Sequence, residues 1–270
     1  MEVISSQNQA KKITKSYNNI VLVPTMGNLH QGHLSLLDKA REVGKTIITS
    51  IYVNPLQFGP NEDFDNYPRT IEDDLIKLEQ AGCNFVFYPS EDILQNIKKY
   101  KVSDLSQKMC GKTRPFHFDG VVTIVNKLFD ILNPNFAIFG LKDYQQFLII
   151  RNFFKDSDFN TKIIGSPIIR ESDGLAMSSR NSLLTANNRK IAPFIFEQLT
   201  WIKDNIKNKN HDELILTSVE AFKTLSLFPE YLSILNPNTL EVAKGGDESL
   251  LIAIAVKLGN VRLIDNILVN

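Results

Sequence analysis

Two histidines lie three residues apart in the segment of the chain whose residue types are best suited to chemistry. This segment, MGNLHQGH at residues 26–33, follows a short apolar run and precedes an amphipathic helical pattern. A strand that enters a helix through a short turn leaves unpaired backbone N–H groups pointing out of the helix start, and such groups bind anions, above all phosphate. His30 and His33 add donors beside the same position, and Gly27 and Gly32 let a ligand approach the backbone. We therefore expect a nucleoside triphosphate to bind here.

Two other interpretations of the histidine pair stay open at this point. The imidazoles could merely bond to carbonyl groups at a strand-to-helix turn, or they could form half of a zinc site. Zinc would need further ligands, and the chain offers only His117, His211, Cys83 and Cys110, none in a paired ligand spacing.

The composition excludes several classes of protein. A formal net charge of zero gives no bulk attraction to nucleic acid or to an anionic membrane, so we expect neither as a partner. Cys83 and Cys110 are far apart in sequence, which fits a reducing compartment and a structural or incidental role for each thiol. The N-terminus lacks the apolar core of a secretory signal, and the longest apolar run, residues 250–256, is too short to span a bilayer. We expect a cytoplasmic protein.

Short apolar runs alternate with longer amphipathic ones through the first two thirds of the 270 residues. This alternation is typical of a parallel sheet with crossover helices. Thr70 has the residue type and position of a helix N-cap, and the Asn54-Pro55 step should end a strand. The expected strands are residues 20–23, 46–53, 85–88, 136–139 and 163–169, and the expected helices are residues 34–43, a helix from 71 onward, 120–132 and 144–154.

The pattern changes after Gly174. One amphipathic helix is expected across residues 191–202, with a possible kink at Pro193, and a second across residues 212–225. Three β-rich runs follow, at residues 231–235, 250–256 and 261–267. We expect a small α+β domain here, joined to the first by a hinge near residues 171–173.

Three further polar clusters fall where loops should follow strands, the edge at which sheets of this kind bind ligands. They are VNPLQF at residues 53–58, FGLKDYQQ at 139–146 and DGLAMSSRN at 173–181. Each taken alone has an ordinary structural explanation. Gln57 could be a loop amide, Lys142 a solvated charge, and Ser178 and Ser179 helix caps or turn formers.

Together, however, these clusters resemble the pantothenate synthetase family, within the HIGH-motif nucleotidyltransferase superfamily. The resemblance covers nearly the whole chain through Asn181 and includes PTMGNLHQGH, VNPLQFGPNEDFDNYPRT, RPFHFDGV, FGLKDYQQ and DGLAMSSRN, in the family's order and approximate spacing. It implies an α/β fold with a Rossmann-like parallel-sheet domain that binds ATP and pantoate, residues 1–171, and a smaller α+β C-terminal lid domain, residues 172–270. It also implies a homodimer.

The activity implied by the resemblance is ATP-dependent ligation of pantoate to β-alanine. Pantoate would first be converted to pantoyl adenylate, and the amine would then displace AMP. The small-molecule partners would be ATP, pantoate and β-alanine, with Mg²⁺ as cofactor on the phosphates.

The resemblance also implies roles for individual residues. The catalytic residues would be His30, His33, Lys142 and Arg180, and Gln57 and Gln146 would bind pantoate. ATP would be bound by Met26, Gly27, Asn28, Leu29, His30, Gln31, Gly32, His33, Gly140, Leu141, Lys142, Asp143, Ile169, Met177, Ser178, Ser179 and Arg180.

Two positions need separate comment. Asp73 and Asp74 match acidic positions near the metal in the family, although acids in the first turn of a helix are equally well explained by the helix dipole. Leu141 stands where the family usually has glutamate, so no role is carried over for a carboxylate there.

Three alternatives remain. The first is a nucleotidylyltransferase that moves AMP onto a phosphorylated acceptor and stops; such an enzyme would not need Gln57 and Gln146 to face an uncharged diol. The second is an RNA-binding relative of the aminoacyl-tRNA synthetases, disfavoured by the zero net charge. The third is an inactive interaction module, disfavoured by the many intact polar clusters.

Overall fold

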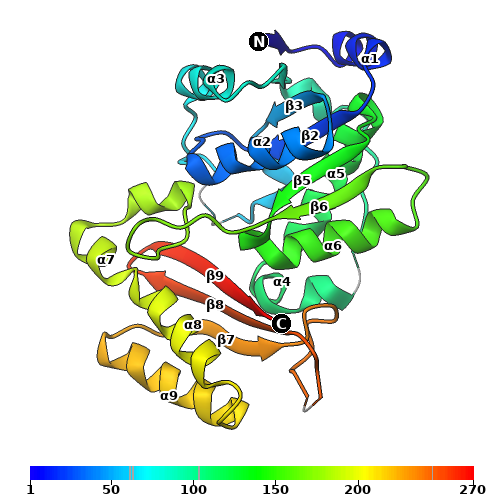
Figure 1. Ribbon diagram of the computed structural model, residues 1–270. Coiled ribbons are helices and arrows are strands. Elements are labelled where there is room, and N and C mark those ends of the chain that lie inside the picture. The colour runs from blue at the N-terminus through cyan, green and yellow to red at the C-terminus, as the bar shows by residue number, and fades with distance from the viewer. Residues whose placement is uncertain (61, 63, 103, 245) are drawn as a thin grey trace. The chain divides into compact units, whose positions relative to one another are not determined.

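A computed structural model describes residues 1–60, 62, 64–102, 104–244 and 246–270 (Figure 1). The chain forms two compact units, which are described separately. The first contains Met1–Leu141 and Gln145–Pro167, and the second contains Lys142–Tyr144 and Ile168–Asn270.

The first unit is built on a parallel sheet of six strands in the order β1-β4-β3-β2-β5-β6. The strands are β1 (Glu2–Ile4), β2 (Ile20–Thr25), β3 (Thr46–Ile51), β4 (Phe85–Phe87), β5 (Phe136–Gly140) and β6 (Lys162–Ser166). The strand β2 lies between β3 and β5, so the loop that follows it leaves from the middle of the sheet. The predicted α/β class with a Rossmann-like sheet is confirmed.

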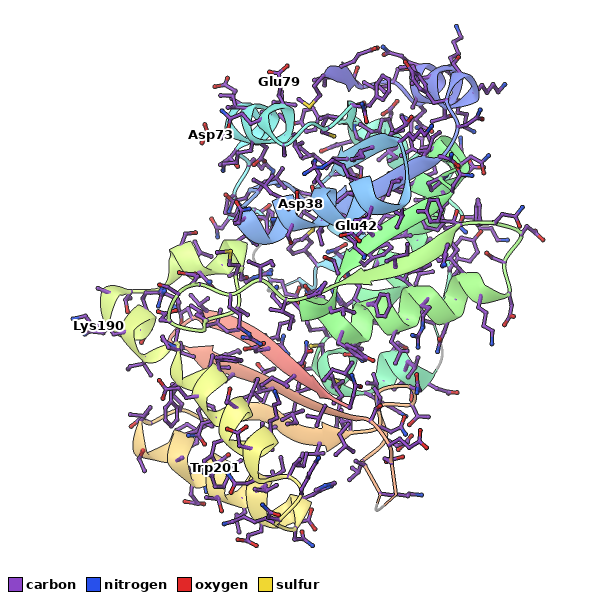
Figure 2. The ribbon with its side chains drawn as sticks, in the orientation of Figure 1. Asp38, Glu42, Asp73, Glu79, Lys190 and Trp201 are labelled. Atoms are coloured by element: carbon purple, nitrogen blue, oxygen red, sulfur yellow. The ribbon has the colours of Figure 1, made fainter. Side chains whose placement is uncertain are left out.

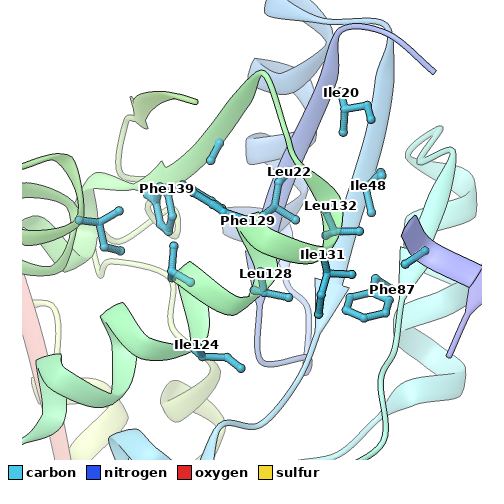
Figure 3. Close-up of a cluster of buried hydrophobic side chains, with 14 of the residues drawn as sticks. Ile20, Leu22, Ile48, Phe87, Ile124, Leu128, Phe129, Ile131, Leu132 and Phe139 are labelled. Carbon is cyan, nitrogen blue, oxygen red and sulfur yellow. The ribbon is translucent and has the colours of Figure 1, made fainter. Parts of the chain in front are cut away.

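Alternate residues of β2 pack into two different clusters. Ile20 and Leu22 belong to one buried cluster, with Phe129 and Leu132 of helix α5 (His117–Leu132), and part of this cluster is drawn in Figure 3. Val21 and Val23 belong to another, to which helices α2 (Gln31–Val43) and α3 (Ile71–Gln80) contribute. Because side chains alternate across a strand, helices cover both faces of the sheet.

The helices of the first unit match most of the sequence expectations. They are α1 (Gln7–Ser16), α2 (Gln31–Val43), α3 (Ile71–Gln80), α4 (Met109–Thr113), α5 (His117–Leu132) and α6 (Tyr144–Lys155). The first residue of α6, Tyr144, belongs to the second unit. Short 3-10 helices are η1 (Pro55–Gln57), η2 (Glu91–Leu94), η3 (Asp104–Gln107) and η4 (Leu141–Asp143).

The N-terminal elements β1 and α1 were not predicted from the sequence. Only Ile4 of β1 is buried, so the strand has no apolar alternation to reveal it. Its stability comes from pairing with β4, where Val3 lies opposite Val86.

The second unit packs helices on an antiparallel sheet of three strands in the order β7-β8-β9, as the predicted α+β domain requires. The strands are β7 (Pro229–Leu235), β8 (Leu250–Leu258) and β9 (Val261–Val269), and the helices are η5 (Ser179–Leu183), α7 (Ala186–Ile191), α8 (Phe194–Asn205) and α9 (His211–Thr224). The helix expected across residues 191–202 is confirmed from Phe194 onward, and the kink expected at Pro193 is a break between two helices. Pro193, which cannot donate a backbone hydrogen bond, is the N-cap residue of α8 and separates it from α7.

The chain passes from the first unit to the second between Pro167 and Ile168. Glu171 and Asp173, where a hinge was expected, lie inside the second unit. Both carboxylates pair with Arg189, at 2.7 Å and 2.6 Å respectively.

Candidate active site

The turn after β2 has an unusual backbone conformation that its residue types permit. Gly27 has φ +82° and Asn28 has φ +50°, both in the left-handed region that glycine and asparagine adopt most readily. Leu29 is then buried at 2% exposure, among residues of α2 and β3. The buried leucine anchors the turn immediately before His30.

The two histidines cap the start of α2. His30 is the N-cap residue, and its Nδ1 accepts a hydrogen bond from the Gly32 backbone N–H at 3.1 Å. The Nδ1 atom of His33 accepts the backbone N–H of His30 at 3.3 Å. This is the geometry of a capping box in which two imidazoles replace the usual hydroxyl and carboxylate.

The capping geometry fixes the tautomer of both rings. An Nδ1 atom that accepts a hydrogen bond carries no proton, so the proton of each neutral imidazole is on Nε2. The ring centroids of His30 and His33 are 4.1 Å apart. The turn therefore holds two Nε2–H donors close together, a suitable arrangement for binding phosphate oxygens.

One expectation about this turn is wrong. Backbone N–H groups were expected to remain unpaired here, but those of Gly27, Asn28, Leu29, His30 and Gly32 all donate to side chains of the protein. Two of these N–H groups, those of His30 and Gly32, are accepted by the imidazoles themselves.

Gln57 lies beside the same turn. Its Nε2 atom is 3.1 Å from the sulfur of Met26, and its Oε1 atom accepts a hydrogen bond from Asn54 at 3.1 Å. Asn54 is 1% exposed and also donates to the carbonyl of Gly120 in α5. The first unit thus brings the clusters at residues 26–33 and 53–58 together.

Arg114 and His117 hold the backbone of Gln57. The His117 Nδ1–H donates to the Gln57 carbonyl at 2.7 Å, because its Nε2 faces a guanidinium nitrogen of Arg114, which can only donate. Arg114 in turn donates to Glu62, with one nitrogen–oxygen distance of 2.7 Å. Burial by itself would raise the pKa of Glu62, but the hydrogen bonds and charge of Arg114, together with a hydrogen bond from the Gly59 backbone and the charge of His117, lower that pKa.

Adjacent glutamines in α6 have different environments. Gln145 is 4% exposed, accepts the Cys110 backbone N–H and donates to the carbonyls of Leu105 and Lys108. Gln146 is only partly buried, and its amide has no hydrogen-bond partner among the described residues. Its amide therefore remains available for a ligand.

Leu141 packs as an apolar residue. It lies against the buried cluster of the first unit, and a Cβ atom built on Gly165 would be 2.6 Å from its Cδ2 atom. A leucine here fills space over Gly165 of β6, so the departure from the family's glutamate has a packing explanation.

Gly140 ends β5 in the first unit, and the second unit holds the remaining predicted ATP-binding residues. Lys142 Nζ lies 3.3 Å from Asp143 Oδ2, and the Lys142 carbonyl accepts a hydrogen bond from Asn266 of β9 at 3.0 Å. The backbone N–H of Met177 donates to the Ile169 carbonyl at 3.0 Å. Ser178 caps η5 by accepting the Arg180 backbone N–H at 3.3 Å, and its hydroxyl proton can still be donated.

Arg170 anchors the loop between Ile169 and Met177. Its guanidinium donates to both carboxylate oxygens of Asp265, at 2.6 Å and 2.9 Å, and to the Gly174 carbonyl. It also lies 3.8 Å above the ring of Phe196. The strand β9 thus holds two predicted ATP-binding segments, through Asp265 and Asn266.

The two acids suggested for a metal ion have different environments. Asp74 is 0% exposed, and its two oxygens accept the backbone N–H groups of Asn28 and Leu29. Asp73 lies at the exposed surface of α3 (Figure 2). Over the described ranges, no group of three or more His, Cys, Asp or Glu side chains is placed to hold a metal ion. Asp74 therefore does not fit the role of a magnesium ligand.

Comparison with known proteins decides the family. A family model described as pantoate-beta-alanine ligase matches residues 2–268. The chain belongs to the pantoate-beta-alanine ligase family. A pantothenate synthetase of Marinobacter nauticus is 43% identical, with 99% of both chains covered, and one of Acinetobacter baumannii is 43% identical, with 92% of this chain and 89% of the relative covered.

Solved structures of the family have the same fold. The crystal structure of pantothenate synthetase from Thermus thermophilus superposes with a TM-score of 0.94 at 34% identity and covers 99% of each chain. The pantoate-beta-alanine ligase of Francisella tularensis, solved in complex with beta-gamma ATP and beta-alanine, gives a TM-score of 0.83 at 33% identity, with 99% of this chain and 97% of that chain covered.

Family membership confirms the expected class of enzyme. The protein is an ATP-dependent ligase that forms pantothenate. The alternatives of a nucleotidylyltransferase, an RNA-binding relative and an inactive module receive no support from these matches. In the described part of the chain, no helix is long and apolar enough to cross a membrane.

Sequence reasoning missed several residues that support the site. Asn54, Arg114 and His117 position Gln57, and Asp265 and Asn266 position the ATP-binding segments of the second unit. The motif RPFHFDG contains Arg114 and His117, so its two basic residues at a spacing of three were the available signal. The contribution of β9 had no local signal.

Proposed function

We propose that the protein activates the pantoate carboxylate by transferring AMP from ATP to it, which gives pantoyl adenylate. It then transfers the pantoyl group from the adenylate to the amine of β-alanine. A carboxylate is a poor electrophile, so its oxygen must first become part of a leaving group. In the first step a pantoate oxygen attacks the α-phosphorus of ATP, and the bond to diphosphate breaks. In the second, the neutral amine attacks the acyl carbon, loses a proton, and AMP leaves.

The observation that best supports this proposal is the pair of oriented Nε2–H donors on His30 and His33. Negative charge grows on the leaving oxygen and around the α-phosphate as diphosphate departs. Donors that are already oriented lower the barrier most, because they need no reorganisation during the reaction. The hydrogen bonds to both Nδ1 atoms supply this orientation.

We propose ATP-binding residues for each unit taken by itself. The first unit would supply residues 26–33, Gly140 and Leu141. Gly140 and Leu141 would contribute backbone groups and packing. The second would supply Lys142 and Asp143 for ribose and phosphate, Ile169 for adenine, and Met177, Ser178, Ser179 and Arg180 for the triphosphate. Lysine, arginine and hydroxyl groups are suited to phosphate oxygens because all of them donate hydrogen bonds.

Gln57 and Gln146 are proposed to bind pantoate. A neutral amide can donate to a carboxylate and accept from a hydroxyl group, and pantoate carries both. The hydrogen bonds that Arg114 and His117 make to the Gln57 carbonyl support this assignment, because they fix the backbone of a residue that must orient a small substrate.

Magnesium is proposed as an ion carried by the triphosphate, with phosphate oxygens and water as ligands. The two hydrogen bonds that Asp74 accepts argue against that carboxylate as a ligand. When bound, the ion would neutralise charge on the phosphates.

We further propose a cytoplasmic location and a homodimeric state. The location is supported by two buried cysteines that form no disulfide, Cys83 and Cys110, and burial raises the pKa of the Cys83 thiol, which makes it less reactive. The dimer is supported only by the resemblance to the family, and sedimentation of the purified protein tests it.

The experiment that tests the proposed function has two stages. The protein is incubated with ATP, magnesium and pantoate, and diphosphate is measured; β-alanine is then added and AMP is measured. We expect up to one diphosphate per enzyme in the first stage and continuous AMP release in the second. Rapid AMP release that does not depend on β-alanine would contradict the proposal.

A further inference from the structure

Side chains of helix α3 bind backbone N–H groups and a backbone carbonyl of the two residues just before His30. The carboxylate of Asp74 accepts the backbone N–H of Asn28 at 2.8 Å and that of Leu29 at 2.7 Å. One turn further along the helix, Lys77 Nζ donates to the Leu29 carbonyl at 2.8 Å. The side chain of Thr70, one turn earlier, donates to Asp74 at 3.3 Å.

These contacts stabilise a backbone conformation that the turn would otherwise leave readily. Asn28 is a non-glycine residue with φ +50°, preceded by Gly27 at φ +82°. A Cβ atom on Gly27 would lie 3.0 Å from the Asp74 carboxylate, so the turn and the acid are closely fitted. A charged acceptor with two N–H donors is a strong hydrogen-bonding arrangement, and it holds the left-handed residues in place.

The contact from Lys77 acts on the histidines through one peptide group. The Leu29 carbonyl, which accepts from Lys77, and the His30 N–H, which donates to His33 Nδ1, belong to the same planar peptide unit. Lys77 therefore fixes the plane of this unit and polarises its N–H group toward the His33 ring. The orientation of both imidazoles depends on that hydrogen bond and on its neighbour at Gly32.

We propose that Asp74 and Lys77 are positioning residues for His30 and His33, with Thr70 orienting the Asp74 carboxylate. Asp74 sets the backbone of the turn, and Lys77 sets the peptide group that holds the His33 ring. The consequence for catalysis rests on the proposed function of the two histidines. The effect on ring orientation does not.

The test uses Asp74→Asn in the full-length protein. Asparagine keeps the shape of the side chain, but its nitrogen cannot accept the second N–H group. We expect about a hundred-fold lower kcat for pantoate-dependent diphosphate release, since small misplacements of catalytic groups cost this much, with a smaller change in the KM for ATP. Glu72→Gln, an exposed acid in the first turn of the same helix, is the matched control and should behave like the parent.

Side-chain ¹⁵N NMR of the histidines separates this proposal from the proposed function. In the parent protein we expect the Nε2–H tautomer for His30 and His33, and in Asp74→Asn a shift of their ring signals toward a mixture of tautomers. Shifted ring signals with unchanged activity would support the positioning role and contradict the catalytic role of the histidines. Unchanged ring signals would overturn the positioning role, as would recovery of activity at high magnesium concentration, which indicates a metal ligand.

Lys77→Met provides a second variant if Asp74→Asn does not fold. Methionine keeps an apolar stem of similar length and removes only the donor to the Leu29 carbonyl. We expect about a ten-fold lower kcat and the same direction of change in the His33 ring signals, because a single neutral acceptor loses its charged partner. Parent-like ring signals in this variant would overturn the role of Lys77.

Discussion

His33 accepts the backbone N–H of His30 through Nδ1 at 3.3 Å, and His30 accepts the backbone N–H of Gly32 through its own Nδ1, so main-chain N–H groups at the start of α2 orient both rings. This relationship explains why two imidazoles occur at a spacing of three residues at the start of α2. They cap the helix with one nitrogen and carry a proton on the other.

Replacing His33 by alanine should therefore affect rate far more than folding. The variant loses one oriented donor, which costs about a hundred- to a thousand-fold in the rate of diphosphate release. It also loses one capping contact, worth about 1 kcal/mol of the free energy of unfolding. Turnover and thermal melting check the two effects, and turnover equal to that of the parent would contradict the catalytic assignment.

Gln57→Ala and Gln146→Ala should weaken pantoate binding more than ATP binding. Each removes an amide proposed to contact pantoate, and neither removes a charge from the phosphate site. Steady-state KM values for the two substrates check this, and equal losses for both would contradict the assignment. Gln145→Ala is the contrasting variant, since its buried amide holds backbone groups from Leu105 to Cys110, and it should lower stability instead.

The ion pair of Glu62 with Arg114 should give an acid-dependent contribution to stability. The pKa of Glu62 is lowered in the folded protein from its ordinary value of 4.5, because burial, which raises it, is outweighed by Arg114 together with Gly59 and His117. The unfolded state therefore binds the proton more readily, and the stabilisation is present above pH 4.5 and is lost as the pH falls through the folded pKa.

Glu62→Gln measures this contribution. At neutral pH we expect the variant to be less stable by on the order of 1 kcal/mol. This difference in the free energy of unfolding should shrink as the pH falls below the pKa of the Glu62 carboxyl group in the unfolded state. Urea unfolding at several pH values checks this expectation. A difference that grows toward acid pH would show that the sign is wrong.

Asp265→Asn should destabilise the second unit strongly. The change leaves Arg170 partly buried without its counter-ion, and breaking a buried pair in this way costs about 3–5 kcal/mol. Because Arg170 precedes the loop that contains Met177 and Ser178, the KM for ATP should also rise. Guanidinium unfolding and ATP titration check the two effects; parent-like values in both would contradict the anchoring role of β9.

Local sequence patterns predicted the elements that carry most of the site. The apolar run of β2 and the helical spacing of α2 follow from side-chain alternation and periodicity, and the histidine pair could have been recognised as a capping pattern at the N-cap and third helical positions. By contrast, the resemblance to the family suggested a metal-binding role for Asp74, with the helix dipole as the alternative, and its actual partners, the N–H groups of Asn28 and Leu29, are too distant in sequence to be recognised. The same reason hid β1, the role of Gln145, and the contacts that β9 makes with Arg170 and Lys142.

Isotope transfer tests the central claim of adenylation followed by aminolysis most directly. Pantoate labelled with ¹⁸O in its carboxylate is turned over with ATP, magnesium and unlabelled β-alanine, and AMP is analysed by mass spectrometry. Since the attacking oxygen stays on phosphorus when the amine displaces AMP, we predict one ¹⁸O atom in each AMP formed. Unlabelled AMP would contradict the account.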